Sequence, residues 1–209
     1  MKQTLIHDER LGRQIEFLIA IDQLKHVLRR AYLPGTDRTE NTAEHSWHLA
    51  VAVLLLAEYA AEPVDLVRVA RMALIHDIVE IDAGDTFFFD AVGVLDKAER
   101  EQRAAERLFG LLPADQAAEF RAAWDEFEER ATPEARFVSA LDRFMPLLHN
   151  YLSEGRAWRQ HGVRPEQVLA MTTRIDPGAP AIAAVARALL ADAEAAGYFA
   201  PRAEAAHAP

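Results

Sequence analysis

The chain has 209 residues, a formal net charge of −10 at pH 7 and no cysteine. The lack of cysteine excludes disulfides and cysteine-bound zinc, and the negative charge disfavours binding to DNA or RNA polymers. No run of 18 apolar residues occurs, and the polar N-terminus lacks the apolar core of a signal peptide. We therefore expect a cytoplasmic protein that does not cross a membrane.

Alanine, leucine, glutamate and arginine are abundant and glycine is scarce, which predicts an all-α fold. Hydrophobic periodicity and capping residues predict seven helices, separated by polar or glycine-containing segments. Their approximate ranges are 8–31, 41–59, 63–80, 96–110, 114–130, 133–152 and 181–196. We expect residues 1–200 to form a single domain and residues 201–209 to be a disordered tail.

The second predicted helix has a recognisable start, because Asn41 and Glu44 stand in the spacing of a capping box. The third predicted helix begins at Pro63 and carries an apolar stripe at spacings of three and four. The members of this stripe are Leu66, Val69, Ala70, Ala73 and Leu74.

The same spacing extends the stripe of the third helix to Asp77 and then to Glu80. A carboxylate on a buried face is costly unless it is paired or bound to a metal. His76 precedes Asp77 and lies one helical turn before Glu80. We therefore expect these three polar side chains to lie close together at one end of the helix.

Two other apolar helices also carry a polar residue where an apolar one is expected. His45 begins the segment HSWHLAVAVLLLAEY, and Asp142 interrupts the segment FVSALDRFMPLL. One divalent metal ion bound by His45, His76, Asp77 and Asp142 would explain why all three apolar helices carry polar residues. The interiors of helix bundles often hold such sites. Two imidazoles and two carboxylates suit Co, Mn, Mg, Zn, Ni or Fe.

Simpler interpretations compete with the metal site. One is a buried salt bridge in which Asp77 and Asp142 pair with Arg71 or Arg143. A His-Asp pair also occurs by chance, and we interpret the pair at residues 7 and 8 as solvated. We expect His48 to pack against the core or to support a ligand. The remaining histidines, which are His149, His161 and His207, are expected to pack or to face solvent.

Three segments of the chain resemble the HD metal-dependent phosphohydrolase superfamily, and in particular the bacterial 5'-deoxynucleotidases and the HD-domain-containing protein 2 family. They are RTENTAEHS at 38–46, ALIHDIVEIDAGDT at 73–86 and EARFVSALDRF at 134–144, and WDEFEERAT at 124–132 is similar to the eukaryotic branch. The resemblance runs from about Leu24 to Tyr151. It implies an HD-domain helical bundle, one divalent metal ion and a homodimer. It also implies hydrolysis of (deoxy)nucleoside 5'-monophosphates to nucleoside and phosphate.

The resemblance also implies roles for individual residues, by matched position. Glu80 matches the catalytic acid, and Arg29 matches an arginine that contacts the substrate phosphate. Asp85 and Thr86 match a segment that borders the substrate site. HD phosphodiesterases with two metals usually carry extra histidines between the two ligand aspartates, and this chain has none there. The chain therefore resembles the mononuclear enzymes.

The departures from this resemblance fall at the substrate site. Arg30 stands where the bacterial enzymes often have an aromatic residue, and Phe87, Phe88 and Phe89 follow the second motif. These three phenylalanines could line a pocket, but we favour their interpretation as core or dimer contacts. Two alternative functions stay open: hydrolysis of another nucleotide such as an alarmone, and a non-catalytic nucleotide-binding HD protein.

Overall fold

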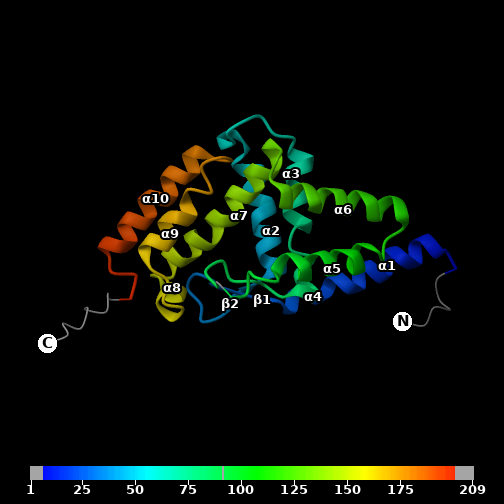
Figure 1. The fold of residues 1–209 in the computed structure, drawn as a ribbon, viewed down its shortest axis with the longest axis horizontal. Coiled ribbons are helices and arrows are strands. Elements are labelled where there is room, and N and C mark those ends of the chain that lie inside the picture. Colours follow the sequence, from blue (N-terminus) through cyan, green and yellow to red (C-terminus); the bar gives the residue numbers. More distant parts are fainter. Residues whose placement is uncertain (1–6, 91, 201–209) are drawn as a thin grey trace.

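The computed structural model describes residues 7–90 and 92–200 and is dominated by helices, as the composition predicts (Figure 1). The helices are α1 (Glu9–Ile21), α2 (Thr42–Leu55), α3 (Leu66–Ile75), α4 (Glu80–Ala83), α5 (Lys97–Phe109), α6 (Ala114–Glu129), α7 (Pro133–Leu152), α8 (Arg156–Gln160), α9 (Pro165–Thr172) and α10 (Pro180–Ala195). Two short 3-10 helices, Asp22–His26 and Ala57–Tyr59, and two strands, β1 (Leu28–Tyr32) and β2 (Thr39–Asn41), complete the described elements. None of these helices has both the length and the apolar character that a membrane span requires.

Side-chain caps determine where several helices begin. The predicted capping box of α2 is present, because Asn41 accepts a hydrogen bond from the Glu44 amide at 2.9 Å and the Glu44 carboxylate accepts one from the Asn41 amide at 3.1 Å. Asp65 caps α3, and Thr132 caps α7. Pro133 occupies the first position of α7, where the missing N–H has no intrahelical partner to lose.

Helices α2, α3 and α7 pack against one another at the centre of the molecule (Figure 1). One hydrophobic cluster joins these three helices to α9 and α10. A second cluster joins α1, α5 and α6 to the segment that follows α3. The C-terminal end of α3 therefore lies where the two clusters meet, and the polar residues that follow it are enclosed on several sides.

The first predicted helix ends ten residues early, at Ile21. Its expected final turns form β1, which pairs antiparallel with β2 and places Leu28 opposite Asn41. The backbone groups of β1 are satisfied across this ladder rather than within a helix, so a tertiary contact overrides local helix propensity. The pairing brings Arg29 next to the start of α2.

The third predicted helix is also shorter than expected, because α3 ends at Ile75 and turns connect it to α4. The predicted stripe is confirmed at Val69 and Ala73, which are fully buried, but Leu66 and Leu74 are about half exposed. Met72 and His76, outside the predicted stripe, are buried instead. Glu80 is buried as expected, but as the first residue of a new helix rather than the end of the stripe.

Residues 153–180, expected to be a polar connection, contain α8 and α9. Their buried residues Ala157, Trp158, Val168 and Met171 close one side of the molecule. The expected tail at 201–209 lies outside the described residues, and the single domain over 1–200 stays a prediction.

Candidate metal and substrate site

His76 is the C-cap of α3, and its buried side chain faces the space between α2 and α7. Its Nδ1 lies 3.0 Å from the Ala73 carbonyl oxygen. A carbonyl can only accept, so Nδ1 donates this hydrogen bond. The other ring nitrogen, Nε2, is buried and has no hydrogen-bond partner. A histidine with one nitrogen held by the backbone and the other unoccupied is suited to bind a metal.

The other three predicted ligands surround this nitrogen. His76 Nε2 lies 3.1 Å from Asp77 Oδ1 and 3.7 Å from Asp142 Oδ1. His45 Nε2, from the first turn of α2, lies 3.0 Å from Asp142 Oδ1 and 3.9 Å from Asp77 Oδ2. One ligand atom each from His45, His76 and Asp142 lies within 4.8 Å of the other two. The fold therefore gathers all four predicted residues at one point.

The charges in this cluster are strongly coupled. Burial alone would lower the pKa of His76, but the carboxylates of Asp77 and Asp142 raise it to about 10. Burial opposes ionisation of the two aspartates, yet the neighbouring imidazoles lower the pKa of Asp77 to about 2 and that of Asp142 well below its ordinary value. Two ionised carboxylates and an imidazole nitrogen that has no hydrogen-bond partner are a suitable ligand set for a divalent cation.

The buried salt bridge from Asp77 or Asp142 to Arg71 or Arg143 is not found. Within residues 7–90 and 92–200, Asp77 pairs with Arg29 and the histidines, and Asp142 pairs with histidines alone.

Arg29 projects from β1 into the acidic side of the site, and only 12% of its side chain is exposed. Its Nη1 donates a hydrogen bond to Asp77 Oδ2 at 2.9 Å and lies 3.7 Å from Asp85 Oδ1. Its Nε lies 3.6 Å from Glu40 Oε2. Although burial disfavours its charge, the surrounding carboxylates raise the pKa of Arg29, so it is a permanent cation beside the proposed ligands.

Glu80 is the first residue of α4, and only 5% of it is exposed. Its Oε2 accepts a hydrogen bond from the Thr42 hydroxyl at 3.0 Å. Burial and the negative charge of Asp77 raise the pKa of Glu80 well above its ordinary value. A raised pKa favours the protonated form of Glu80, which is the form in which a carboxyl can act as a general acid.

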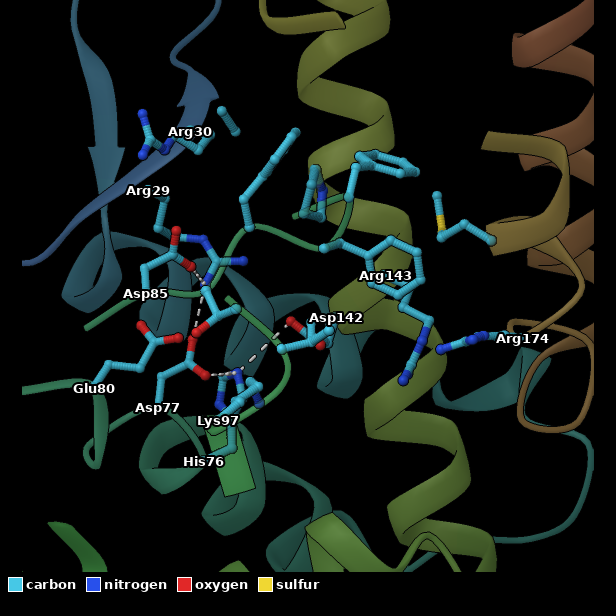
Figure 2. A pocket seen from close by; sticks show the side chains of 18 of the residues that line it. Arg29, Arg30, His76, Asp77, Glu80, Asp85, Lys97, Asp142, Arg143 and Arg174 are labelled. Atoms are coloured by element: carbon cyan, nitrogen blue, oxygen red, sulfur yellow. Dashed lines mark hydrogen bonds and ion pairs between the residues drawn. The ribbon is translucent and has the colours of Figure 1, made fainter. Parts of the chain in front are cut away.

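These residues line one cavity of about 490 Å³ (Figure 2). Arg29, His76, Asp77, Glu80, Asp85, Thr86 and Asp142 all contribute to its wall. Burial raises the pKa of Asp85, and the Thr86 hydroxyl accepts a hydrogen bond from Arg100 at 3.2 Å. The cavity volume is within the range of about 300–1,000 Å³ that small-molecule sites occupy.

Phe87, Phe88 and Phe89 all line the cavity, so the interpretation as core or dimer contacts is incomplete. Phe87 and Phe89 also pack against the central hydrophobic cluster, with their ring centroids 5.3 Å apart. Gly84 ends α4 at a φ of 74°, a conformation that glycine adopts readily, and directs the chain back along the cavity.

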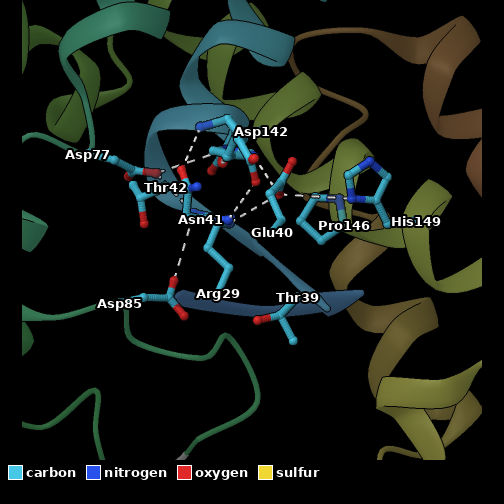
Figure 3. A network of polar contacts seen from close by, with 12 residues as sticks. Arg29, Thr39, Glu40, Asn41, Thr42, Asp77, Asp85, Asp142, Pro146 and His149 are labelled. Atoms are coloured by element: carbon cyan, nitrogen blue, oxygen red, sulfur yellow. Dashed lines mark hydrogen bonds and ion pairs between the residues drawn. The ribbon is translucent and has the colours of Figure 1, made fainter. Parts of the chain in front are cut away.

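Glu40 and His149 are absent from the predicted site, yet both are buried beside it (Figure 3). Glu40 Oε2 lies 3.5 Å from His45 Nδ1 and 3.9 Å from His149 Nδ1. Despite burial, His45 lowers the pKa of Glu40, so the carboxylate is ionised. Ligand atoms of Glu40, His48 and His149 also lie within 4.8 Å of one another. Side chains alternate between the two faces of β2, so its middle residue, Glu40, is buried. The sequence would have indicated this burial only if a strand had been predicted there.

Comparison with known proteins identifies the family. The HD-domain family model matches residues 21–183. The chain belongs to the HD-domain family. Among curated relatives, bovine 5'-deoxynucleotidase HDDC2 is 33% identical over 130 residues and human 5'-deoxynucleotidase HDDC2 is 31% identical over 130 residues. Each alignment covers 62% of this chain and 62% of the relative, so the chain aligns with less than two thirds of these relatives' length.

Solved structures support the same family. A protein from Magnetospirillum magnetotacticum MS-1, described as a predicted metal-dependent phosphohydrolase, is 55% identical with a TM-score of 0.87, over 92% of this chain and 96% of that one. The PH0347 protein from Pyrococcus horikoshii OT3 is 22% identical with a TM-score of 0.60, over 87% of this chain and 99% of that one. This second likeness shows the HD fold alone.

Proposed function

We propose that this HD-domain protein is a metal-dependent phosphohydrolase that converts (deoxy)nucleoside 5'-monophosphates to nucleoside and phosphate. The observation that carries the proposal is the buried Nε2 of His76, which has no hydrogen-bond partner and faces two ionised aspartates. It lies in the same cavity as Glu80, whose pKa is raised. The names of the Magnetospirillum and mammalian relatives support the same activity.

In this proposal His45, His76, Asp77 and Asp142 hold one divalent metal ion, which is Co, Mn, Mg, Zn, Ni or Fe. A bound metal of this kind lowers the pKa of a water molecule and offsets charge on a phosphate. The Ala73 carbonyl holds His76 in the tautomer that presents Nε2 to the ion. Glu40 Oε2 lies 3.5 Å from Nδ1 on the far side of the His45 ring, where its negative charge would orient the ring with Nε2 toward the ion.

The remaining residues bind and protonate the substrate. Arg29 holds the phosphate, because a guanidinium forms paired hydrogen bonds with phosphate oxygens. Asp85 and Thr86 border the sugar. The oxygen of water forms a new bond to phosphorus while the bond from phosphorus to the 5' oxygen breaks. Glu80 gives its proton to that leaving oxygen, and nucleoside and inorganic phosphate result.

Phosphate release from purified protein tests the proposal. The substrates are nucleoside and deoxynucleoside 5'-monophosphates, triphosphates and a guanosine tetraphosphate alarmone, each with Co, Mn, Mg and Zn. Release from monophosphates supports the proposal, whereas release from the alarmone alone would overturn it. Metal binding without any turnover would favour a non-catalytic nucleotide-binding protein.

We carry two further expectations into the proposal, a homodimer and a cytoplasmic location. Light scattering on the purified protein tests the first, and cell fractionation tests the second.

A further inference from the structure

The cavity has two chemically different ends (Figure 2). His76, Asp77 and Glu80 lie at one end, together with Arg29 and Lys97, and Asp142 lies between this end and Arg143. The other end is lined by Arg130, Arg143 and Arg174. Arg29 already serves the phosphate that is hydrolysed, so these three arginines have no assigned role in the proposed reaction.

The three arginines come from separate parts of the chain. Arg143 belongs to α7, Arg174 follows α9, and Arg130 is the C-cap of α6. Arg130 has a φ of 54°, in the left-handed region where glycine or asparagine is usual. Figure 2 shows Arg143 and Arg174 together, across the cavity from Asp77 and Glu80.

The positive charges at this end lack adequate protein partners. Within residues 7–90 and 92–200, no carboxylate oxygen lies within 4.0 Å of Arg143 or Arg174, and the only one for Arg130 is Glu128 at 3.9 Å. Arg143 donates hydrogen bonds to the carbonyl and hydroxyl oxygens of Ser139, but its buried Nε has no partner. Burial lowers the pKa of Arg143, and although the neighbouring Asp142 opposes this, the charges of Arg130 and Arg174 lower it further. An anion between these groups would relieve their repulsion.

Aromatic and apolar side chains also line the cavity. Phe87, Phe88, Trp158 and Met171 line the cavity, and the Arg174 guanidinium lies 5.2 Å from the centre of the Phe88 ring. This wall suits the face of a nucleobase, which is flat and aromatic.

We propose that Arg143 and Arg174, with Arg130 at the rim, bind a second anionic group of the substrate. The substrate class is then a nucleotide that carries another phosphate, remote from the 5' phosphate that is removed. This inference rests on the proposed phosphohydrolase function. The second phosphate is bound but not cleaved, so the bonds formed and broken stay those of the proposed reaction.

The test compares 2'-deoxyadenosine 5'-monophosphate with 2'-deoxyadenosine 3',5'-bisphosphate as substrates. For the wild type we expect the KM for the bisphosphate to be roughly ten- to a hundredfold lower than the KM for the monophosphate. One to two charge-assisted hydrogen bonds to the second phosphate would give a difference of this size. Arg174→Gln should remove most of this difference while the KM for the monophosphate changes less than about twofold. High salt should reduce the difference in the wild type, because the arginines are partly exposed.

Arg103→Gln is the matched control, since Arg103 is an exposed surface arginine paired with Glu99 and does not line the cavity. It should leave both KM values unchanged. Arg143→Lys keeps the charge at a half-buried position, and it should retain part of the preference if Arg174→Gln proves unstable.

Equal wild-type KM values for the two substrates would overturn the inference. So would an equal loss on both substrates in Arg174→Gln, which would place the arginine at the hydrolysed phosphate. If the wild type hydrolyses neither substrate, the phosphohydrolase proposal fails. Calorimetry with the bisphosphate then decides the arginine site: tight binding that Arg174→Gln weakens supports it, and no binding refutes it.

Discussion

Replacement of Glu80 by glutamine tests the proposed acid directly. Glutamine has nearly the shape of a protonated glutamate, and its amide oxygen can still accept the hydrogen bond that Thr42 donates at 3.0 Å. The variant should fold with a free energy of unfolding within about 1 kcal/mol of the wild type. It cannot give a proton to the leaving oxygen, so turnover should fall by about 10²- to 10⁴-fold. At about 1.4 kcal/mol per factor of ten, the barrier rises by about 3–5 kcal/mol.

The assay is phosphate release at saturating deoxynucleoside monophosphate, with metal content measured on the same sample. The pKa of Glu80 is raised, so its acid form is present at low pH and is lost as pH rises through that pKa. The wild-type kcat should therefore fall on the alkaline side, and Glu80→Gln should lose this dependence. Asp82→Asn is the control, because Asp82 lies on the same short helix but pairs with Arg107 at the surface. Turnover of Glu80→Gln within tenfold of the wild type would refute the reasoning.

Three further predictions concern the proposed metal. Asp142→Asn removes the charge of a ligand atom that lies 3.0 Å from His45 Nε2. Mass spectrometry should therefore find much less than the one metal ion per chain that we expect for the wild type. Full metal occupancy in the variant would exclude Asp142 as a ligand. His76 carries a proton below a pKa of about 10, and a metal must displace that proton, so metal affinity should rise by about tenfold per unit between pH 6 and 8. A flat profile in a competitive titration would contradict this. Glu40→Gln weakens the contact that orients His45, and metal affinity should fall by roughly ten- to a hundredfold at an unchanged melting temperature. Wild-type affinity in this variant would show that Glu40 has no such role.

The differences between prediction and structure have specific physical causes. Residues 28–32 were predicted to be helical because helix propensity depends only on nearby residues. They form β1 instead because they pair with β2, and local propensity does not include this contact. The stripe of α3 was right at Val69 and Ala73 but missed Met72 and His76, because neighbours on both sides enclose the end of this helix. The same enclosure buries His76, which the predicted stripe had placed beside its apolar face.

The sequence by itself determined the all-α class, the capping box at Asn41 and the polar residues set in apolar helices. Each of these depends on local propensity or on the cost of burying an unpaired polar group, and both apply whatever the final packing. Only the tertiary structure decided that Arg29 pairs with Asp77, that Glu40 lies behind His45, and that arginines from α6, α7 and the end of α9 meet in one cavity. These contacts join residues far apart in the chain. Their energies depend on distances and burial that arise only when the helices pack.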